Sequence, residues 1–272
     1  MKKIMALLIS ACMLFAFAGC GGKENTASDG SATKSDSETV KEKGKLIIGI
    51  TDYAPMDYEE TKGSGEWIGF DADMAKAFAK SLGVEAEFVV IDWDNKIMEL
   101  KAGSIDCVWN GMTITDEVKN GMSVSNAYCK NTQVVIVPKD KADKYQTVES
   151  VKDLKFAAEA GSAGEKALKA LNYNVTAVTA QADALMEVAA GTSDAAVIDL
   201  LMAGAMIGEG TSYENLTYTV GVAEEEDFGV GFRKGSDLTE KLNEFFKTAY
   251  ADGSMMDTAK TYGVQESIIE QK

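Results

Sequence analysis

The 272-residue sequence has no histidine and only one arginine, Arg233, so lysine provides almost all of its 27 basic residues. Without histidine the chain cannot build a Ser–His–Asp or Cys–His nucleophile or a histidine metal site. With one arginine, forked guanidinium contacts to phosphates or carboxylates are nearly excluded. These absences favour a binding protein over an enzyme, and we expect no catalytic residue, no metal and no cofactor.

Positive charge is also scarce. The 43 acidic residues exceed the 27 basic ones and give a net charge of −16, which argues against nucleic acid as a partner. The hydrophobic fraction of 46% and the charged fraction of 26% are typical of a globular chain. The length suits one large domain or two modest ones.

The N-terminus has the pattern of a secretion signal. Lys2 and Lys3 precede an apolar run over 4–18, which is shorter than the roughly 20 residues that span a bilayer. The run ends in Ala-Phe-Ala-Gly before Cys20, and this segment resembles a bacterial lipobox. Residues 1–19 are therefore predicted to be a lipoprotein signal peptide, with lipidation of Cys20. The alternative is an ordinary signal peptide with an incidental cysteine.

The segment after Cys20 lacks the residues that build a core. Residues 21–44 contain no aromatic side chain and almost no large aliphatic one. As a flexible coil they would span about 25–30 Å r.m.s.. Residues 20–44 are predicted to be a tether that holds the protein at the outer face of the cytoplasmic membrane, the periplasmic side in a host with two membranes. No second long apolar run follows.

Processing at Cys20 would leave two cysteines in the folded part, Cys107 and Cys129. Export permits a disulfide, but Cys107 lies in an apolar, strand-like run, and buried free cysteine is common. We expect two unpaired thiols, with a disulfide as the alternative.

From residue 45 onward, strand patterns alternate with helix patterns. The predicted strands cover 45–51, 85–91, 107–111, 132–137 and 227–234, and the predicted helices cover 71–83, 94–103 and 236–253. This alternation is typical of α/β layers with largely parallel sheets. Residues 99–109 (ELKAGSIDCVW) and 187–197 (EVAAGTSDAAV) also share a helix–glycine–strand pattern, which suggests two lobes of similar topology.

The ordered motifs resemble those of the family 3 extracellular solute-binding proteins, the polar amino-acid receptors of ABC importers. The resemblance rests on GITDYAP, GFDADMAKAFAKSLGV and IDWDNKIMELKAGSIDCVWNGMTIT, followed by EAGSAGEKAL, DAAVID, FGVGFRKGSDL and ADGSMMDTAKTYGV. It implies a type II periplasmic-binding-protein fold, in which two α/β lobes joined by two hinge strands close over a ligand. The predicted boundaries are 45–131 for lobe 1, 132–226 for lobe 2, and 227–272 for the return to lobe 1.

The resemblance also implies a set of ligand-binding residues in lobe 1. Tyr53 matches the family's aromatic cleft wall, and Trp93 matches the large side chain that covers the other side of the ligand. Aromatic faces suit an aliphatic stem and an ammonium group. Asn110, Gly111 and Thr113 match the segment whose backbone groups and hydroxyl contact the ligand. Ordinary core packing is the alternative for both aromatic residues.

In lobe 2 the resemblance points to two places. Ser162 and Ala163 follow Gly161 at a predicted helix start, where exposed N–H groups form a carboxylate site. A plain N-cap is the alternative for Ser162, and the two roles can coexist. Asp199, at the end of a predicted strand, matches the acid that receives the ligand's α-ammonium group.

One position departs from the family pattern. Val118 stands where the family usually has the arginine that binds the ligand's carboxylate, and the side chain of Lys119 is rotated by about 100° from it. Either helix N-termini and hydroxyls hold the carboxylate, or the ligand carries less negative charge than a typical amino acid. Acidic residues near the expected cleft favour a cationic or zwitterionic ligand, with simple surface exposure as the alternative; they are Asp52, Asp57, Glu59 and Glu159.

The expected function is capture of a polar amino acid or related amine by a monomer that delivers it to an ABC permease. A first alternative is a sensor domain acting with a separate signalling partner. A second is a dehydratase-like enzyme on the same fold. The second is disfavoured because cyclic dicarboxylate substrates need cations that the cleft motifs lack.

Overall fold

The computed structural model describes residues 34–272. The predicted signal peptide (1–19), the lipidation site Cys20 and the tether residues up to 33 lie outside the described residues. Within the described part, no helix combines the length and apolar character needed to cross a membrane.

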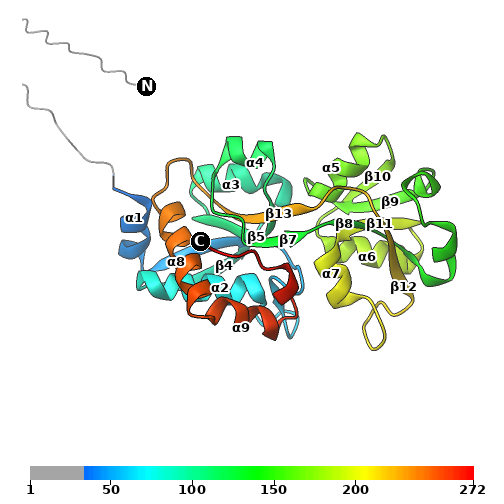
Figure 1. Ribbon diagram of the computed structural model, residues 1–272. Helices are drawn as coiled ribbons and strands as arrows, with labels where there is room; N and C mark the ends of the chain where they lie inside the picture. Colours follow the sequence, from blue (N-terminus) through cyan, green and yellow to red (C-terminus); the bar gives the residue numbers. More distant parts are fainter. Residues whose placement is uncertain (1–33) are drawn as a thin grey trace, which may run out of the picture. The chain divides into compact units, whose positions relative to one another are not determined.

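Lobe 1 is built on a sheet in the order β4-β1-β5-β13-β6, with β7 also paired to β13 (Figure 1). Its strands are β1 (Lys45–Ile50), β4 (Glu85–Val90), β5 (Cys107–Thr113), β6 (Ser123–Val124), β7 (Cys129–Asn131) and β13 (Glu226–Phe232). β1, β4 and β5 run parallel, whereas β13 is antiparallel to β5. A small hairpin of β2 (Tyr58–Glu59) and β3 (Trp67–Ile68) also follows β1 in the chain.

Helices cover both faces of this sheet. α2 (Phe70–Leu82), α8 (Leu238–Ala251) and α9 (Ser254–Thr261) lie on one side, and α3 (Lys96–Ala102) and α4 (Asp116–Gly121) lie on the other (Figure 1). The strand sequences dictate this, because alternate side chains point to opposite faces. Leu46 and Ile48 join the core under α2, whereas Ile47 packs against the core under α3.

Lobe 2 repeats the scheme with a sheet in the order β10-β9-β11-β8-β12. Its strands are β8 (Gln133–Pro138), β9 (Lys155–Glu159), β10 (Asn174–Val178), β11 (Ala195–Asp199) and β12 (Leu216–Gly221). Its helices are α5 (Ala163–Ala170), α6 (Gln181–Ala190) and α7 (Leu200–Met206), and short 3₁₀ helices cover Lys139–Lys144 and Val148–Val151. The other 3₁₀ helices, Trp93–Asn95 and Gln265–Ser267, belong to lobe 1.

The repeated sequence pattern corresponds to equivalent places in the two lobes. α3 and α6 both end at a glycine with positive φ, Gly103 at 78° and Gly191 at 74°. Each glycine leads into the strand at the third position of its sheet, β5 or β11. The α/β two-lobed fold predicted from the sequence is confirmed.

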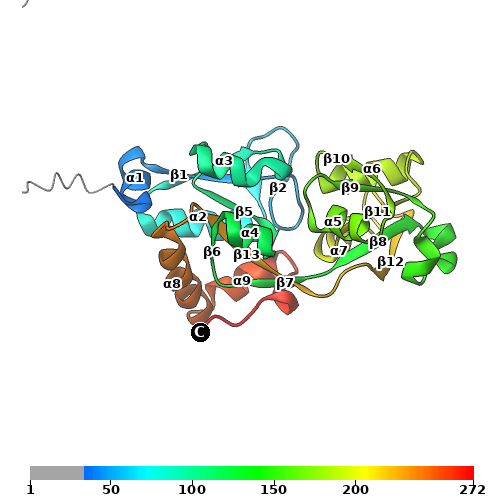
Figure 2. The same cartoon turned by 90° about the horizontal axis from the view of Figure 1, so that it is seen from above.

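The chain passes between the sheets twice. It crosses first at residues 131–133, from β7 to β8, and returns at 221–226, from β12 to β13. The two crossings are neighbours, because Asn131 pairs with Glu226 where β7 meets β13. In the view of Figure 2 both connections run through the middle of the described part.

The prediction of a flexible tether over 20–44 is wrong for its last residues, which form the helix α1 (Asp36–Lys43). Ser35 and Glu38 form a reciprocal capping box at its start. Val40 is fully buried against the lobe 1 core. One buried aliphatic residue and good caps therefore help to order a segment that looks like a linker by composition.

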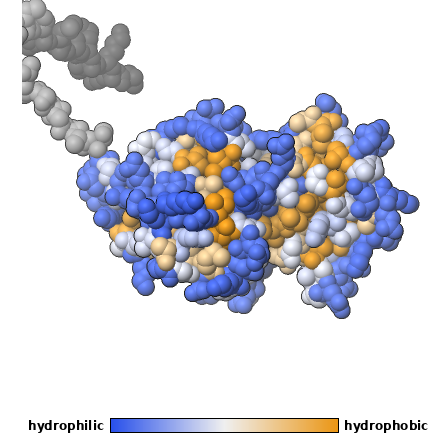
Figure 3. Space-filling model, viewed as in Figure 1, coloured by the Kyte–Doolittle hydropathy of each residue, from blue (hydrophilic) through white to orange (hydrophobic). Residues whose placement is uncertain are grey.

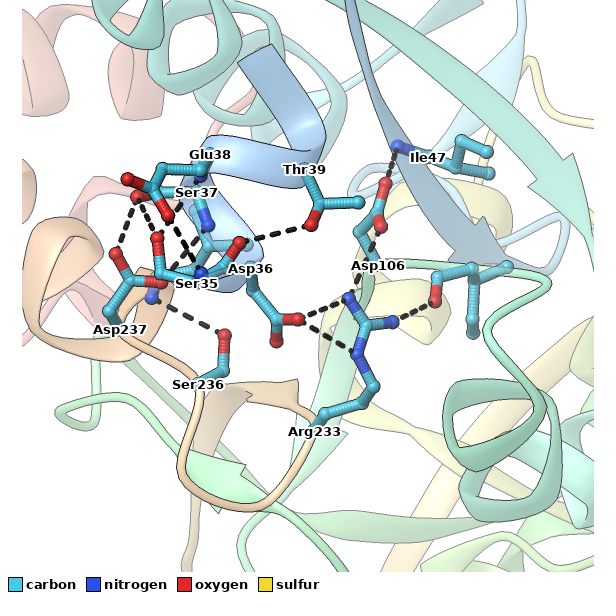
Figure 4. Close-up of polar contacts among 12 residues, drawn as sticks. Ser35, Asp36, Ser37, Glu38, Thr39, Ile47, Asp106, Arg233, Ser236 and Asp237 are labelled. Carbon is cyan, nitrogen blue, oxygen red and sulfur yellow. Dashed lines mark hydrogen bonds and ion pairs between the residues drawn. The ribbon is translucent and has the colours of Figure 1, made fainter. Parts of the chain in front are cut away.

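The lone arginine also secures α1 (Figure 4). Nη2 of Arg233 lies 3.0 Å from Oδ1 of Asp36 and 3.4 Å from Oδ1 of Asp106, and Nη1 donates to the carbonyl of Ile105 at 2.9 Å. The backbone N–H of Ser37 donates to Asp237 at 3.0 Å. α1 is thus bonded to the loop before β5 and to the start of α8.

The two remaining cysteines, Cys107 and Cys129, are both buried and unpaired, as predicted. Burial raises the pKa of the Cys129 thiol, so it stays protonated. On the face shown in Figure 3, hydrophilic residues surround smaller groups of apolar ones, in keeping with the net charge of −16.

Candidate functional site

A small cavity of about 30 Å³ lies between the two lobes. Its walls come from β5, α3 and α4 of lobe 1 and from β8, β9, β11, α5 and α6 of lobe 2. It brings together most of the predicted ligand-binding residues, namely Trp93, Asn110, Gly111, Thr113, Ser162, Ala163 and Asp199. Val118 also lines it, as expected for the position of the missing arginine.

The lobe 1 wall is fixed by a hydrogen bond between strands. Nδ2 of Asn110 donates to Thr51 Oγ1 at 3.1 Å, and Asn110 Oδ1 accepts from Thr51 N at 2.9 Å. This pair joins the end of β1 to β5. The next backbone N–H, of Gly111, donates to Asp71 at 2.7 Å. Asn110 therefore holds the wall in shape and presents little of its own amide to the cavity.

Two predicted residues do not line the cavity. Tyr53 lies behind Gly111, where an added Cβ would be 2.5 Å from Tyr53 Cε1, so only glycine fits. The Tyr53 hydroxyl is buried without a hydrogen-bond partner among the described residues, and burial, then the charge of Asp199, raises its pKa. Asp52 also lies outside the cavity lining; much of the residue is exposed, but neighbouring atoms desolvate its carboxyl group and raise its pKa.

The start of α5 forms part of the lobe 2 wall. Ser162 is the N-cap, and its hydroxyl accepts from Glu165 N at 3.0 Å. The first N–H groups of an α-helix have no carbonyl partner within the helix and carry partial positive charge. Ala163 provides such a group at the cavity, which suits a carboxylate.

Asp199 ends β11 and is only 3% exposed. Amide donors converge on its carboxylate from Asn131, from Gln133 at 2.6 Å and from Gln181. The amides of Asn131 and Gln133 also donate to Glu226, each at 2.6 Å. Burial and the nearby Glu226 raise the pKa of Asp199 to about 8. Without a cationic partner the Asp199 site therefore keeps a proton at pH 7.

Glu159 ends the neighbouring parallel strand β9, so its carboxylate lies at the same sheet edge as Asp199. It is 2% exposed, and its Oε1 has no hydrogen-bond partner among the described residues. Burial, followed by the charge of Asp199, raises the pKa of Glu159 to about 8. The two carboxyl groups make the lobe 2 wall a strong acceptor of hydrogen bonds and of positive charge.

Several residues that line or support the cavity are not predicted from the sequence. Gln133 and Gln181 supply the amides that hold Asp199, and Lys96 and Lys166 line the cavity. Lys96 stands three residues after Trp93 at the first turn of α3, and that spacing could have placed it beside the indole. Nothing local to Gln133 or Gln181 signals their role, because it arises only when β8, α6 and β11 meet.

Three contacts join the lobes around the cavity. Lys166 of α5 pairs with Glu117 of α4 at 2.6 Å. Lys96 Nζ donates to Gly161 O at 3.3 Å. Gly161 also meets Asp94 so closely that an added Cβ would lie 2.5 Å from Asp94 Oδ1 and 2.7 Å from its Cα. The lobes are therefore in direct contact on this side of the cavity.

Comparison with known proteins gives a consistent result. The family model described as "Bacterial extracellular solute-binding proteins, family 3" matches residues 46–265. An arginine-binding extracellular protein of Bacillus subtilis is 30% identical over 270 residues, covering 96% of this chain and 98% of the relative. A glutamine-binding protein of an ABC transporter in the same organism is 30% identical, covering 93% and 94%.

Solved structures have the same fold. A substrate-binding protein of an ABC uptake transporter from Streptococcus pneumoniae, crystallised with histidine, has a TM-score of 0.78 at 27% identity, covering 87% of this chain and 99% of that one. An ancestral amino-acid-binding protein, described as a precursor of cyclohexadienyl dehydratase, has a TM-score of 0.76 at 31% identity, covering 84% and 99%. These neighbours are named as binding proteins.

Proposed function

Because the chain belongs to the family 3 bacterial extracellular solute-binding proteins, we propose that it captures a polar amino acid or related amine between its lobes and delivers it to an ABC permease. The observation that carries this proposal is the buried Asp199 carboxylate at the cavity wall, positioned by three side-chain amides. An α-ammonium group provides the positive charge that this buried acid lacks.

Each wall of the cavity has a role in this proposal. Asp199 accepts the α-ammonium and gives up its proton as the cation arrives. Trp93 covers one side of the ligand. The N–H groups at the start of α5 face the carboxylate. Glu159, with one unpaired oxygen, accepts a hydrogen bond from the ligand's side chain. Amino acids with amide, imidazole, ammonium or guanidinium side chains fit this arrangement, and acidic ones do not.

The mechanism consists of binding and closure without covalent chemistry. The ligand touches both lobes only when they are together, so it stabilises the closed state by its differential affinity. The crossings at 131–133 and 221–226 act as the hinge, and Asn131, Gln133 and Glu226 connect them directly to Asp199. An enzymatic role like that of a dehydratase is disfavoured because the described cavity holds neither histidine nor arginine.

The proposed anchoring rests on the sequence alone. Lipidation of Cys20 would hold the protein at the outer face of the cytoplasmic membrane, beside its permease. Metabolic labelling with a clickable palmitate analogue tests this, because Cys20→Ala must lose the label and shift from the membrane fraction to the medium. Equal labelling of both forms would refute the anchor.

A ligand screen tests the proposed function itself. Thermal unfolding is measured with the twenty common amino acids and with putrescine and spermidine, because a ligand raises apparent stability by RT ln(1 + [L]/Kd). We expect stabilisation by one or more polar, non-acidic amino acids and its loss in Asp199→Asn. Stabilisation by aspartate or glutamate alone would contradict the role of the acidic wall. Deleting the gene must also abolish uptake of the ligand; retained uptake with altered signalling would favour the sensor alternative.

A further inference from the structure

We propose that Lys96 binds the ligand's α-carboxylate and so replaces the arginine that would stand at position 118. This inference rests on the proposed function and names a determinant of specificity within the same cavity. Lys96 would thereby supply the positive charge that Val118 cannot offer to the ligand's carboxylate.

Lys96 is placed as a carboxylate-binding group would be. It lines the same cavity as Val118 and is only 6% exposed. Its Nζ donates to Trp93 O at 2.9 Å and to Gly161 O at 3.3 Å, and it lies 4.7 Å from the centre of the Trp93 ring. An ammonium group has three N–H donors, so these bonds leave one donor for a further acceptor.

The ammonium of Lys96 has acidic side chains nearby but no direct ion pair; Glu117, Glu159 and Asp94 favour its charged form from a distance. Among residues 34–272, no carboxylate forms an ion pair with it, whereas nearby Lys166 is paired with Glu117 at 2.6 Å and its side chain is 42% exposed. A buried charge without a bonded counter-ion is costly, and burial, followed by the charge of Lys166, lowers the pKa of Lys96 to about 8 despite these acids. A ligand carboxylate would remove this penalty. Lys166, which already has a partner and faces solvent, gains little from one.

The surroundings define the ligand's position. Gly161 O, which accepts from Lys96, directly precedes the N-cap Ser162 of α5. The first turn of α5, which begins at Ala163, supplies N–H groups without a partner in the helix. A carboxylate beside Nζ is therefore also next to these N–H groups, and it bridges α3 of lobe 1 with α5 of lobe 2. Asp199 stands on a different strand, β11, and remains free for the ammonium group.

This arrangement explains why valine is tolerated at position 118. Val118 is buried in the small core of α3 and α4, together with Leu100 and Met122. The Val118 side chain borders the cavity as well as this core, but it brings no charge or hydrogen-bond donor to it. With Lys96 supplying the cation from the start of α3, position 118 can serve packing alone.

The test is a double-mutant cycle between protein and ligand, measured by calorimetry at pH 7. The protein forms are wild type, Lys96→Met and Lys101→Met; Lys101 is an exposed lysine on the same helix that does not line the cavity. The probes are L-arginine, L-lysine, L-histidine and L-glutamine, each with its α-carboxamide. An amide keeps the ammonium and the side chain but removes the negative charge.

We expect amidation to weaken binding to wild type and to Lys101→Met by roughly ten- to a hundredfold, the size of a charged hydrogen bond. Lys96→Met should bind the amino acid more weakly than wild type by a similar factor, whereas its affinity for the amide should be close to that of wild type. Equal amidation losses in Lys96→Met and wild type would overturn the proposal, because they would show that another group holds the carboxylate.

Two controls keep the outcome interpretable. If Lys96→Met is not folded by circular dichroism, Lys96→Gln replaces it, because it keeps a donor while losing the charge. If wild type binds none of the four amino acids and none of the wider thermal screen, the proposed function itself fails, and the role of Lys96 fails with it. Amino-acid binding that is unaffected by amidation overturns only the role of Lys96.

Discussion

Gly161 offers a direct test of whether the lobes close on the contact seen here. It stands at φ 71° just before α5, and its Cα faces Asp94 of the other lobe. In Gly161→Ala the new Cβ would lie 2.7 Å from Asp94 Cα. Ordinary carbon contacts are about 3.5–4.0 Å, so the lobes would have to separate by about 1 Å at this point.

The matched control is Gly191→Ala. Gly191 has φ 74°, and an added Cβ meets nothing within 4 Å. Both variants strain the left-handed backbone by about 1–2 kcal/mol, so both should lower the free energy of unfolding by that amount. Only Gly161→Ala also opposes closure. Overpacking costs about 1–3 kcal/mol, so its ligand dissociation constant should rise about 5- to 150-fold.

The assay has two parts. Calorimetry gives the dissociation constant of the strongest ligand in the screen for wild type and both variants, and urea unfolding gives their stabilities. Small-angle scattering with saturating ligand should show a larger radius of gyration for Gly161→Ala. Affinities that match between the two variants would refute the reasoning, because the Asp94 contact would then have no part in the bound state.

Three further predictions follow from the site and from α1. Asp199→Asn should fold but bind the ligand at least about a hundredfold more weakly, because the buried ammonium loses its counter-charge; calorimetry with near-native affinity would contradict this. The pKa of Glu159 is raised from 4.5 to about 8 in the folded protein. Its contribution to the free energy of unfolding is therefore fully present below about pH 4.5 and is lost as the pH rises through 8, at up to about 1.4 kcal/mol per pH unit. The free energy of unfolding of Glu159→Gln, measured with urea from pH 5 to 8, should thus fall less steeply with pH than that of wild type. Equal slopes would show that Glu159 is ionised throughout this range. Arg233→Met should detach α1, with faster hydrogen exchange over 36–43 and about 1–3 kcal/mol lower stability; unchanged exchange would mean that Val40 and the caps suffice.

Much of the fold follows from local pattern. The strands around Leu46 and Val108 alternate between two cores, and the helices before Gly103 and Gly191 end where glycine permits positive φ. Such signals lie within a few residues of one another. They also placed Ser162, because an N-cap is a local feature.

The site was only partly predictable, because its charges are set by contacts between distant segments. Asp199 could be named, but the amides of Gln133 and Gln181 come from elements 66 and 18 residues away. Tyr53 was expected in the wall and instead supports Gly111 from behind. The last part of the predicted tether folds because Arg233, 197 residues away, holds Asp36.

The position of α1 determines where an outside force would act on the protein. Asp36 is joined to the loop before β5 through Arg233, and Ser37 is joined to α8 through Asp237. A pull from the preceding chain, as a membrane anchor would exert, is therefore delivered to lobe 1. Under the proposed mechanism, lobe 2 would carry no such load and would be free to move on the two crossings while lobe 1 is held. In the anchored protein, closure would thus consist of lobe 2 moving toward a lobe 1 that is fixed in position.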